Sequence, residues 1–233
     1  MGEPVSDFNA IQTDVRQRGI TRLCHFTRSE KLAHMLAQTQ AILPTQELRA
    51  RYPDLLDVTD TQRLDGRLDY ICCSIEYPNI WYFRTIKAHS MPFRDWIILC
   101  LDPCLLWERV ALFSPRNAAA QRGALLRPGW QGWSALFHPE VSGAGGRVRG
   151  RTPRLLKCCP TDDQAEVLIP GAVSKHYIRA VIVADADQAH REQVRYRVLG
   201  LEADFEWRIA PALFTPAWST AVRQGQRPEE QLL

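Results

Sequence analysis

The sequence predicts an α+β fold in which short strands alternate with helices. Apolar runs of strand type are separated by segments in which apolar residues recur at helical spacing. The hydrophobic content of 45% is enough for a sizeable core. No repeat and no Pro/Gly/Ser-rich linker divides the chain, so we expect one domain over residues 1–233. Its core is expected at about residues 20–210, followed by a mobile tail after Ala221.

The first forty residues predict a helix, a strand and a second helix. Residues 1–20 place their apolar side chains on one side of a short amphipathic helix. Residues 21–26 form an apolar run of strand type. The second helix extends to about Thr39, and Thr27 or Ser29 is expected to cap its N-terminus.

The middle of the chain alternates between polar loops and apolar runs. Residues 43–68 are polar and contain two prolines, so we expect a long loop with a short helix, and such loops are usually functional. A buried strand is expected at 69–75 and an aromatic-rich helix at 78–85. The clearest strand is 96–101, because Asp-Pro ends it abruptly. A helical turn and a further strand are expected at 105–107 and 110–113.

The C-terminal half begins with a glycine-rich segment, residues 114–153, which reads as a loop. Beyond it, β-branched and aliphatic runs predict strands at 166–169 and 178–184. A polar helix is expected at 187–199, and a last strand at 205–209.

The charge balance is mildly basic, with a formal net charge of +3 and a pI near 8.5. This is compatible with binding to nucleic acid but does not identify such a protein. Four arginines fall close together, Arg147, Arg149, Arg151 and Arg154. They either follow a phosphodiester backbone or belong to a solvated loop.

The seven cysteines predict neither disulfides nor a metal site. Their odd number and two adjacent pairs argue against a disulfide framework, and the spacing expected of zinc ligands is missing. A reducing cytoplasm is the simplest setting. No apolar stretch is long enough to span a bilayer, and the first residues lack the pattern of a signal peptide. We therefore expect a cytoplasmic protein without a membrane partner.

The most informative segment runs from Asp163 to Ile169, where Gln164 and Glu166 lead into an apolar run. Alternate residues of a strand share a face, so the amide and the carboxylate are expected side by side at its start. Such a pair suits a site that orients a sugar hydroxyl and stabilises positive charge at an anomeric carbon. The alternative is an ordinary strand start with a solvated glutamate.

Other segments carry polar groups at the ends of expected elements. His25 and Thr27 could hold an amide or a ribose, or they could be a core histidine and a capping threonine. Arg63 could bind a phosphate, or it could lie in a solvated turn. Several aromatic residues could stack on a base or a nicotinamide ring, or simply fill the core: Tyr77, Trp81, Tyr82 and Phe83. Residues 113–119 could touch substrate or form a plain turn.

Several common site motifs are missing from the sequence. There is no GxxxxGK[ST] segment for a P-loop, no GxGxxG segment for a Rossmann dinucleotide site and no HExxH metal helix. No GxSxG nucleophile elbow marks a hydrolase.

Four segments occur in an order that resembles the DarT family of DNA ADP-ribosyltransferase toxins. They are His25-Phe26-Thr27, Arg63-Leu64-Asp65-Gly66, Ser74-Ile75-Glu76-Tyr77-Pro78-Asn79 and Gln164-Ala165-Glu166-Val167-Leu168. The resemblance covers roughly residues 20–185. None of these segments is specific by itself, but all four in this order are.

The resemblance implies the ADP-ribosyltransferase fold, with two small mixed or antiparallel sheets around an NAD cleft and flanking helices. It implies an enzyme that takes NAD as ADP-ribose donor, needs no metal and modifies a nucleobase in single-stranded DNA. It further implies the toxin of a toxin–antitoxin or phage-defence system, with a macrodomain antitoxin of the DarG type as partner.

The resemblance also assigns roles to residues. Glu166 is implied as the catalytic glutamate, on the strand that follows a substrate-recognition loop at about 158–164, and Arg63 as the arginine needed for NAD binding and catalysis. The implied cofactor contacts are His25, Thr27, Arg63, Asn79 and Tyr82. The implied substrate contacts are Gln164, Arg147, Arg149, Arg151 and Arg154.

The target base and the acceptor stay open at this point. Arg63–Gly66 and Ser74–Asn79 favour the guanine-modifying branch of the family, and Ile71–Ser74 lacks the proline- and phenylalanine-rich strand expected of the thymine branch. The alternatives are an ADP-ribosyltransferase acting on RNA or protein, a catalytically silent nucleic-acid-binding module and an unrelated α+β hydrolase.

Overall fold

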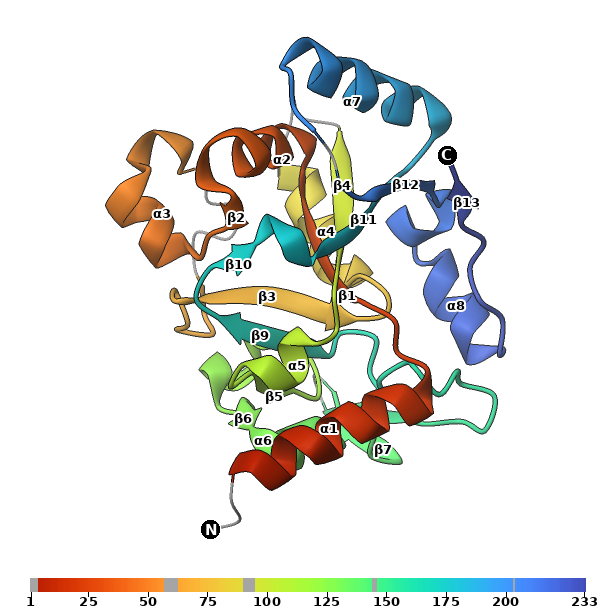
Figure 1. Cartoon of the computed structure of the whole chain (residues 1–233). Helices are drawn as coiled ribbons and strands as arrows, with labels where there is room; N and C mark the ends of the chain where they lie inside the picture. The colour runs from red at the N-terminus through yellow and green to blue at the C-terminus, as the bar shows by residue number, and fades with distance from the viewer. Residues whose placement is uncertain (1–3, 57–62, 90–94, 144–145, 203) are drawn as a thin grey trace.

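The computed structural model describes residues 4–56, 63–89, 95–143, 146–202 and 204–233, and it has the expected α+β architecture (Figure 1). The large mixed sheet has the strand order β13-β12-β11-β4-β1-β3-β9-β5-β6. Its strands are β1 Leu23–Arg28, β3 Tyr70–Ile75, β4 Trp96–Leu101, β5 Leu112–Ser114, β6 Arg127–Pro128, β9 Glu166–Pro170, β11 Ile178–Val183, β12 Glu206–Ile209 and β13 Gln231–Leu232. Two small ladders pair β2 Ala41–Ile42 with β10 Val173–Ser174, and β7 Glu140–Ser142 with β8 Val148–Gly150.

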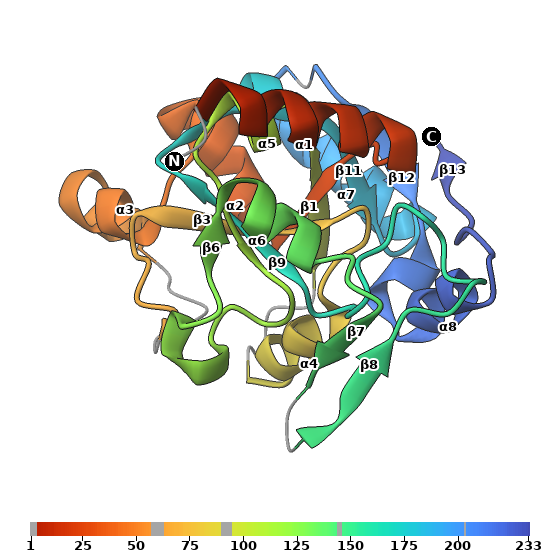
Figure 2. The same cartoon turned by 90° about the horizontal axis from the view of Figure 1, so that it is seen from below.

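Helices lie on the outside of this sheet (Figures 1 and 2). They are α1 Pro4–Arg18, α2 Ser29–His34, α3 Thr45–Arg51, α4 Ile80–His89, α5 Leu105–Glu108, α6 Gly129–Ala135, α7 Ala186–Val198 and α8 Ala217–Arg223. A π-helical turn, Met35–Thr39, continues α2. The amphipathic N-terminal helix is confirmed, because Ile11 and Val15 of α1 are buried. None of the described helices has the length and apolar character that a membrane crossing requires.

The junction between β1 and β3 divides the sheet into two halves. β1 pairs with β4 along its whole length, from Leu23 to Arg28. It pairs with β3 only at Leu23 and Cys24, after which the two strands separate. Figure 1 shows β1 and β4 crossing the direction of β3 and β9. The two sheets expected around a cleft are thus joined only at the start of β1 and the end of β3, and they diverge from there.

The central strands bury nearly all their side chains. Ile97 and Leu99 on β4 and Val181 on β11 have no exposed surface. Because helices and loops cover both faces of these strands, the apolar runs are continuous rather than alternating. This explains why the sequence predicted β4 with its correct bounds.

Residues 114–153 are more structured than their glycine content suggested. They contain α6 and the β7–β8 hairpin. Gly132 permits a close approach, since a Cβ there would lie 2.1 Å from the Arg127 carbonyl oxygen. Trp133, on the same helix, is fully buried and donates its indole N–H to Asp14 at 2.7 Å. Tertiary packing outweighs the low helix propensity of glycine here.

The expected cap of the second helix was wrong. Arg28 occupies the N-cap position of α2 and makes no side-chain capping bond. Thr27 stays within β1, because the pairing with β4 continues to Arg28.

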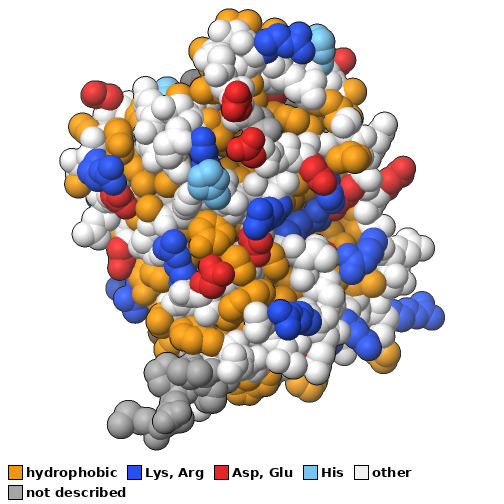
Figure 3. Space-filling model, in the orientation of Figure 1, with side chains coloured by type: hydrophobic (Ala, Val, Ile, Leu, Met, Phe, Trp, Pro, Cys, Tyr) orange, Lys and Arg blue, Asp and Glu red, His pale blue; other side chains and the backbone are white. Residues whose placement is uncertain are grey.

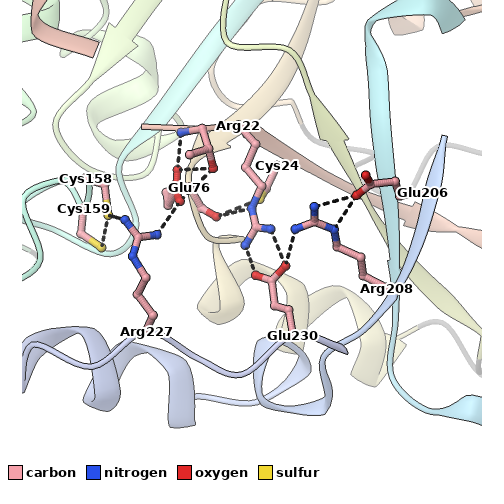
Figure 4. A network of polar contacts seen from close by, with 10 residues as sticks. Arg22, Cys24, Glu76, Cys158, Cys159, Glu206, Arg208, Arg227 and Glu230 are labelled. Atoms are coloured by element: carbon pink, nitrogen blue, oxygen red, sulfur yellow. Dashed lines mark hydrogen bonds and ion pairs between the residues drawn. The ribbon is translucent and has the colours of Figure 1, made fainter. Parts of the chain in front are cut away.

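The residues after Ala221 were expected to form a mobile tail, but several of them contact the rest of the domain (Figure 4). Arg22 is buried and donates to the Glu76 carbonyl at 2.8 Å and to both carboxylate oxygens of Glu230, one of them at 2.7 Å. Arg227 donates to the Glu76 carboxylate at 3.1 Å. β13 pairs with β12. A buried guanidinium needs a counter-charge, and the tail supplies it.

We expect Glu230→Ala to destabilise the protein by about 3 kcal/mol at neutral pH, because it leaves the Arg22 guanidinium buried without its carboxylate. Burial alone raises the pKa of Glu230, but hydrogen bonds from Arg22 and Arg208 outweigh it and hold this pKa below its ordinary value. The stabilisation is therefore present above pH 4.5 and is lost as the pH falls through the lowered pKa. Urea unfolding of Glu230→Ala and of the control Glu229→Ala at pH 7 and pH 4 measures this. Equal midpoints for the two variants at pH 7 would contradict it.

Candidate active site

A deep cavity opens where β1 and β3 separate. Its space, counted with the solvent at its mouth, is about 1210 Å³. All six residues expected to act in catalysis or cofactor binding line it: His25, Thr27, Arg63, Asn79, Tyr82 and Glu166. They come from positions more than a hundred residues apart, and only the fold brings them together.

Glu166 is the first residue of β9 and is held by hydrogen-bond donors from two directions. The Asn79 amide donates to Oε1 at 2.9 Å, and the backbone N–H of Ala118 donates to Oε2 at 2.7 Å. The Asn117 amide lies 3.5 Å from Oε1. The side chain is buried, and β9 pairs Glu166 with Ser114 of β5. These contacts stabilise the charged carboxylate and fix its direction.

Asn79 serves two structures at once. Its Oδ1 accepts the backbone N–H of Tyr82 at 3.2 Å, which is the geometry of a helix N-cap. Asn79 therefore supplies an acceptor for one of the backbone N–H groups that have no partner within the first turn of α4. Its Nδ2 holds Glu166. The Ser74 hydroxyl oxygen accepts the backbone N–H of Asn79 at 3.2 Å. Helix α4, strand β3 and the carboxylate are therefore fixed relative to one another.

His25 is neutral in this environment. Its Nδ1 lies 2.8 Å from the carbonyl oxygen of Cys72, so Nδ1 carries the proton and donates. Burial lowers the pKa of His25, and the charges of Lys31 and Arg63 lower it further. Nε2 is then an acceptor for a ligand hydroxyl or amide N–H.

Arg63 is held by an acidic neighbour. Its Nε and Nη2 donate to the two oxygens of Asp65 at 3.1 and 3.0 Å. The residue has a φ of +35°, a conformation that costs energy for a non-glycine residue and is often found at functional sites. The bidentate pair fixes the guanidinium at the cavity wall.

Comparison with known proteins places this chain in a family. The family model described as "ssDNA thymidine ADP-ribosyltransferase, DarT" matches residues 24–215. The chain belongs to the DarT family. It is an NAD-dependent ADP-ribosyltransferase that acts on single-stranded DNA, with NAD as the ADP-ribose donor. No curated protein matched the sequence.

Solved DarT structures share the fold at low sequence identity. DarT of Thermus sp. 2.9 in complex with carba-NAD⁺ superimposes with a TM-score of 0.55 at 12% identity, over 84% of this chain and 98% of that one. The same protein in complex with ADP-ribosylated ssDNA gives a TM-score of 0.56 at 13% identity, over 84% and 97%. DarTG of Thermosipho africanus in complex with ADP-ribose gives 0.59 at 14% identity, over 83% of this chain and 51% of that one.

The residues expected to bind the DNA substrate lie outside the cavity of this DarT protein. Gln164 is in the turn before β9, which begins only at Glu166, so strand alternation does not place the two side chains on one face. Arg147, Arg149 and Arg154 are exposed. The Arg151 guanidinium instead donates to the carbonyl oxygens of Cys159, Leu156 and Lys157, so it supports the loop that carries them.

Several contributors to the DarT site have no clear sequence signature. The backbone N–H of Ala118 is a main-chain group, and its neighbour Asn117 was expected only in a segment that could touch substrate. Lys31 and Asp65 also line the cavity. Among the described residues, no group of three His, Cys, Asp or Glu side chains is arranged to hold a metal ion, and all seven cysteines are free thiols.

The double role of Asn79 predicts two separable effects. We expect Asn79→Ala and Asn79→Ser both to lower ADP-ribose transfer at least about tenfold, because each removes a hydrogen bond to a charged group. Only Asn79→Ala also removes the helix cap, so its free energy of unfolding should be roughly 1 kcal/mol lower than that of Asn79→Ser. Urea unfolding and initial rates measure both quantities. Equal stability of the two variants would reject the capping role.

The lowered pKa of His25 predicts a pH dependence. When the pH is below 6.5, the ordinary pKa of histidine, His25 takes up a proton in the unfolded chain, whereas the folded protein disfavours this proton. Stability is therefore complete above that value and is lost as the pH falls below it. We expect the melting temperature of the wild type to fall more between pH 7.5 and 5.5 than that of His25→Asn. The exposed His138→Asn serves as control and should behave like the wild type.

Proposed function

We propose that Glu166 is the carboxylate that supports cleavage of the nicotinamide–ribose bond and transfer of ADP-ribose to a base in single-stranded DNA. The observation that carries this is the pair of short contacts on its oxygens, from Asn79 at 2.9 Å and Ala118 at 2.7 Å. A buried, fixed carboxylate at the end of a strand is suited to offset positive charge that develops beside it.

The other cavity residues suit the two ends of the donor. His25 and Thr27, on the part of β1 that has left β3, would fix the amide and ribose end, with Nε2 of His25 as acceptor. Arg63 would bind the pyrophosphate, with Asp65 holding its guanidinium in place. Asn79 orients Glu166, and Tyr82 forms part of the wall.

The reaction balances without a further reactant. The bond between the nicotinamide nitrogen and the ribose carbon breaks, and nicotinamide leaves with the electron pair. A nitrogen of the base forms the new bond to that carbon and loses its proton. Glu166 hydrogen-bonds the ribose hydroxyl and accepts this proton. The base enters unpaired, since stacking in a duplex hides its nucleophilic atom.

The exposed arginines are proposed to act on the DNA backbone. Arg147, Arg149 and Arg154 lie on or beside the β7–β8 hairpin, and their charge suits phosphates. Gln164, in the turn before β9, is proposed to face the acceptor. Figure 3 shows basic and acidic side chains mixed over one face of the molecule, so phosphate contacts there are local rather than a continuous basic surface.

The wider setting is proposed from the relatives. One solved relative is a DarTG protein, which motivates a toxin paired with a macrodomain antitoxin of the DarG type. We propose that residues 1–233 act as a single ADP-ribosyltransferase domain in the cytoplasm, as part of a toxin–antitoxin or phage-defence system. The family description names thymidine, whereas the segments around Arg63 and Ser74 favour guanine by sequence. Mass spectrometry of nucleosides from treated DNA separates the two bases.

The central experiment replaces Glu166 with glutamine, which keeps its size and removes its charge. We expect transfer to fall on the order of 10²–10³-fold, while thermal stabilisation by NAD remains. Labelled NAD is incubated in parallel with single-stranded DNA, RNA and protein. An unchanged rate for Glu166→Gln would refute the catalytic assignment. Label on RNA or protein alone would identify a different acceptor, and binding without NAD consumption would identify a silent module.

A further inference from the structure

Trp81 is an exposed aromatic side chain on the helix that forms part of the cavity wall. It is 36% exposed, whereas Ile80, Phe83 and Ile86 on the same helix are buried. Asn79 and Tyr82 on either side of it line the cavity, but Trp81 does not. The indole therefore lies outside the donor site while being anchored to it through the helix.

The structure distinguishes Trp81 from the other aromatic residues of this segment. Tyr77 and Phe83 are 3% exposed and pack within the core, where Tyr77 stacks on Trp218 and Phe83 meets Trp96 edge to face. In the described part of the chain, Trp81 and Trp130 are the exposed aromatic side chains. Tryptophan is enriched at interfaces because it combines a large apolar ring with a polar N–H.

One hydrogen bond holds the start of α4 against β9, because the Asn79 amide donates to Glu166 at 2.9 Å. Trp81 lies in the first turn of this helix, so its position along the chain is close to the contact with the proposed catalytic carboxylate.

A cationic residue shares the exposed side of the helix with Trp81. Arg84 is exposed and follows Trp81 by three positions, the spacing of neighbours on one side of a helix. A flat aromatic face with an adjacent guanidinium is the combination with which proteins hold single-stranded nucleic acid, because the ring stacks on a base and the cation meets a phosphate.

We propose that Trp81 is the stacking platform for the nucleotide next to the acceptor base, with Arg84 on its phosphate. The acceptor base itself must reach Glu166 inside the cavity, so a platform outside the cavity takes its neighbour. This inference rests on the proposed function for its acceptor, single-stranded DNA. Trp81 is a substrate-binding residue and takes no part in cleavage of the donor.

The first experiment measures binding of a fluorescent single-stranded oligonucleotide, by anisotropy, to proteins that carry Glu166→Gln and therefore modify it too slowly to matter. We expect Trp81→Ala to weaken binding roughly 5- to 150-fold, and Trp81→Phe to restore most of the loss. Trp130→Ala, which removes an equally exposed indole on α6, is the matched control and should bind normally. Thermal stabilisation by NAD should be unchanged in all three.

The second experiment identifies the contact. An abasic site is moved along the oligonucleotide around the acceptor position. At one flanking position, the abasic site should weaken binding to the protein with intact Trp81 by the same factor as the Trp81→Ala substitution does. The same abasic site should not weaken binding to the Trp81→Ala protein any further. If the losses of affinity from the abasic site and from Trp81→Ala multiplied at every position, the stacking role would be overturned. Unchanged binding by Trp81→Ala, or weakened NAD binding instead, would also overturn it.

These outcomes are separate from failure of the proposed function. If the wild type did not modify DNA, the transfer assay would show it, and the anisotropy measurement would still report whether Trp81 contacts a base.

Discussion

The hydrogen bond from Asn79 to Glu166 is the contact on which the site depends. It joins residues 87 positions apart in the sequence, from the start of α4 to the start of β9. The same side chain caps α4, so the position of the helix and the direction of the carboxylate are set together. The Ala118 N–H donates to the second oxygen, so contacts within the protein already fix the direction of the carboxylate.

The cavity exists because two neighbouring strands stop pairing. β1 and β3 share only two residue pairs and then separate, while β1 continues along β4 and β3 along β9. The backbone groups released on the facing edges need partners. One is supplied by a side chain, since the Cys72 carbonyl accepts from His25. The hydrogen bond that orients His25 at the cavity wall thus follows from the same divergence that opens the cavity.

Buried charge organises the opposite side of the molecule as well. Arg22 precedes β1, and its guanidinium is neutralised by Glu230 from the far end of the chain (Figure 4). Glu76, which directly follows β3, accepts from Thr21 and Arg227. The strand junction that opens the cavity at one end is therefore locked at the other end by the C-terminal residues.

The sequence by itself determined the α+β class and the bounds of strands such as β4, because long apolar runs report local structure directly. The six cavity residues were implied by the resemblance of four ordered motifs to the DarT family, and they are His25, Thr27, Arg63, Asn79, Tyr82 and Glu166. The sequence failed where a residue's role depends on distant partners. Glycine-rich residues near Trp133 form a helix because a buried indole holds them, and Arg151 supports a loop because three carbonyl oxygens surround it. The Ala118 N–H, the docked tail and the exposure of Trp81 were decided only in three dimensions. Main-chain donors, burial and long-range ion pairs leave no periodic trace along the chain.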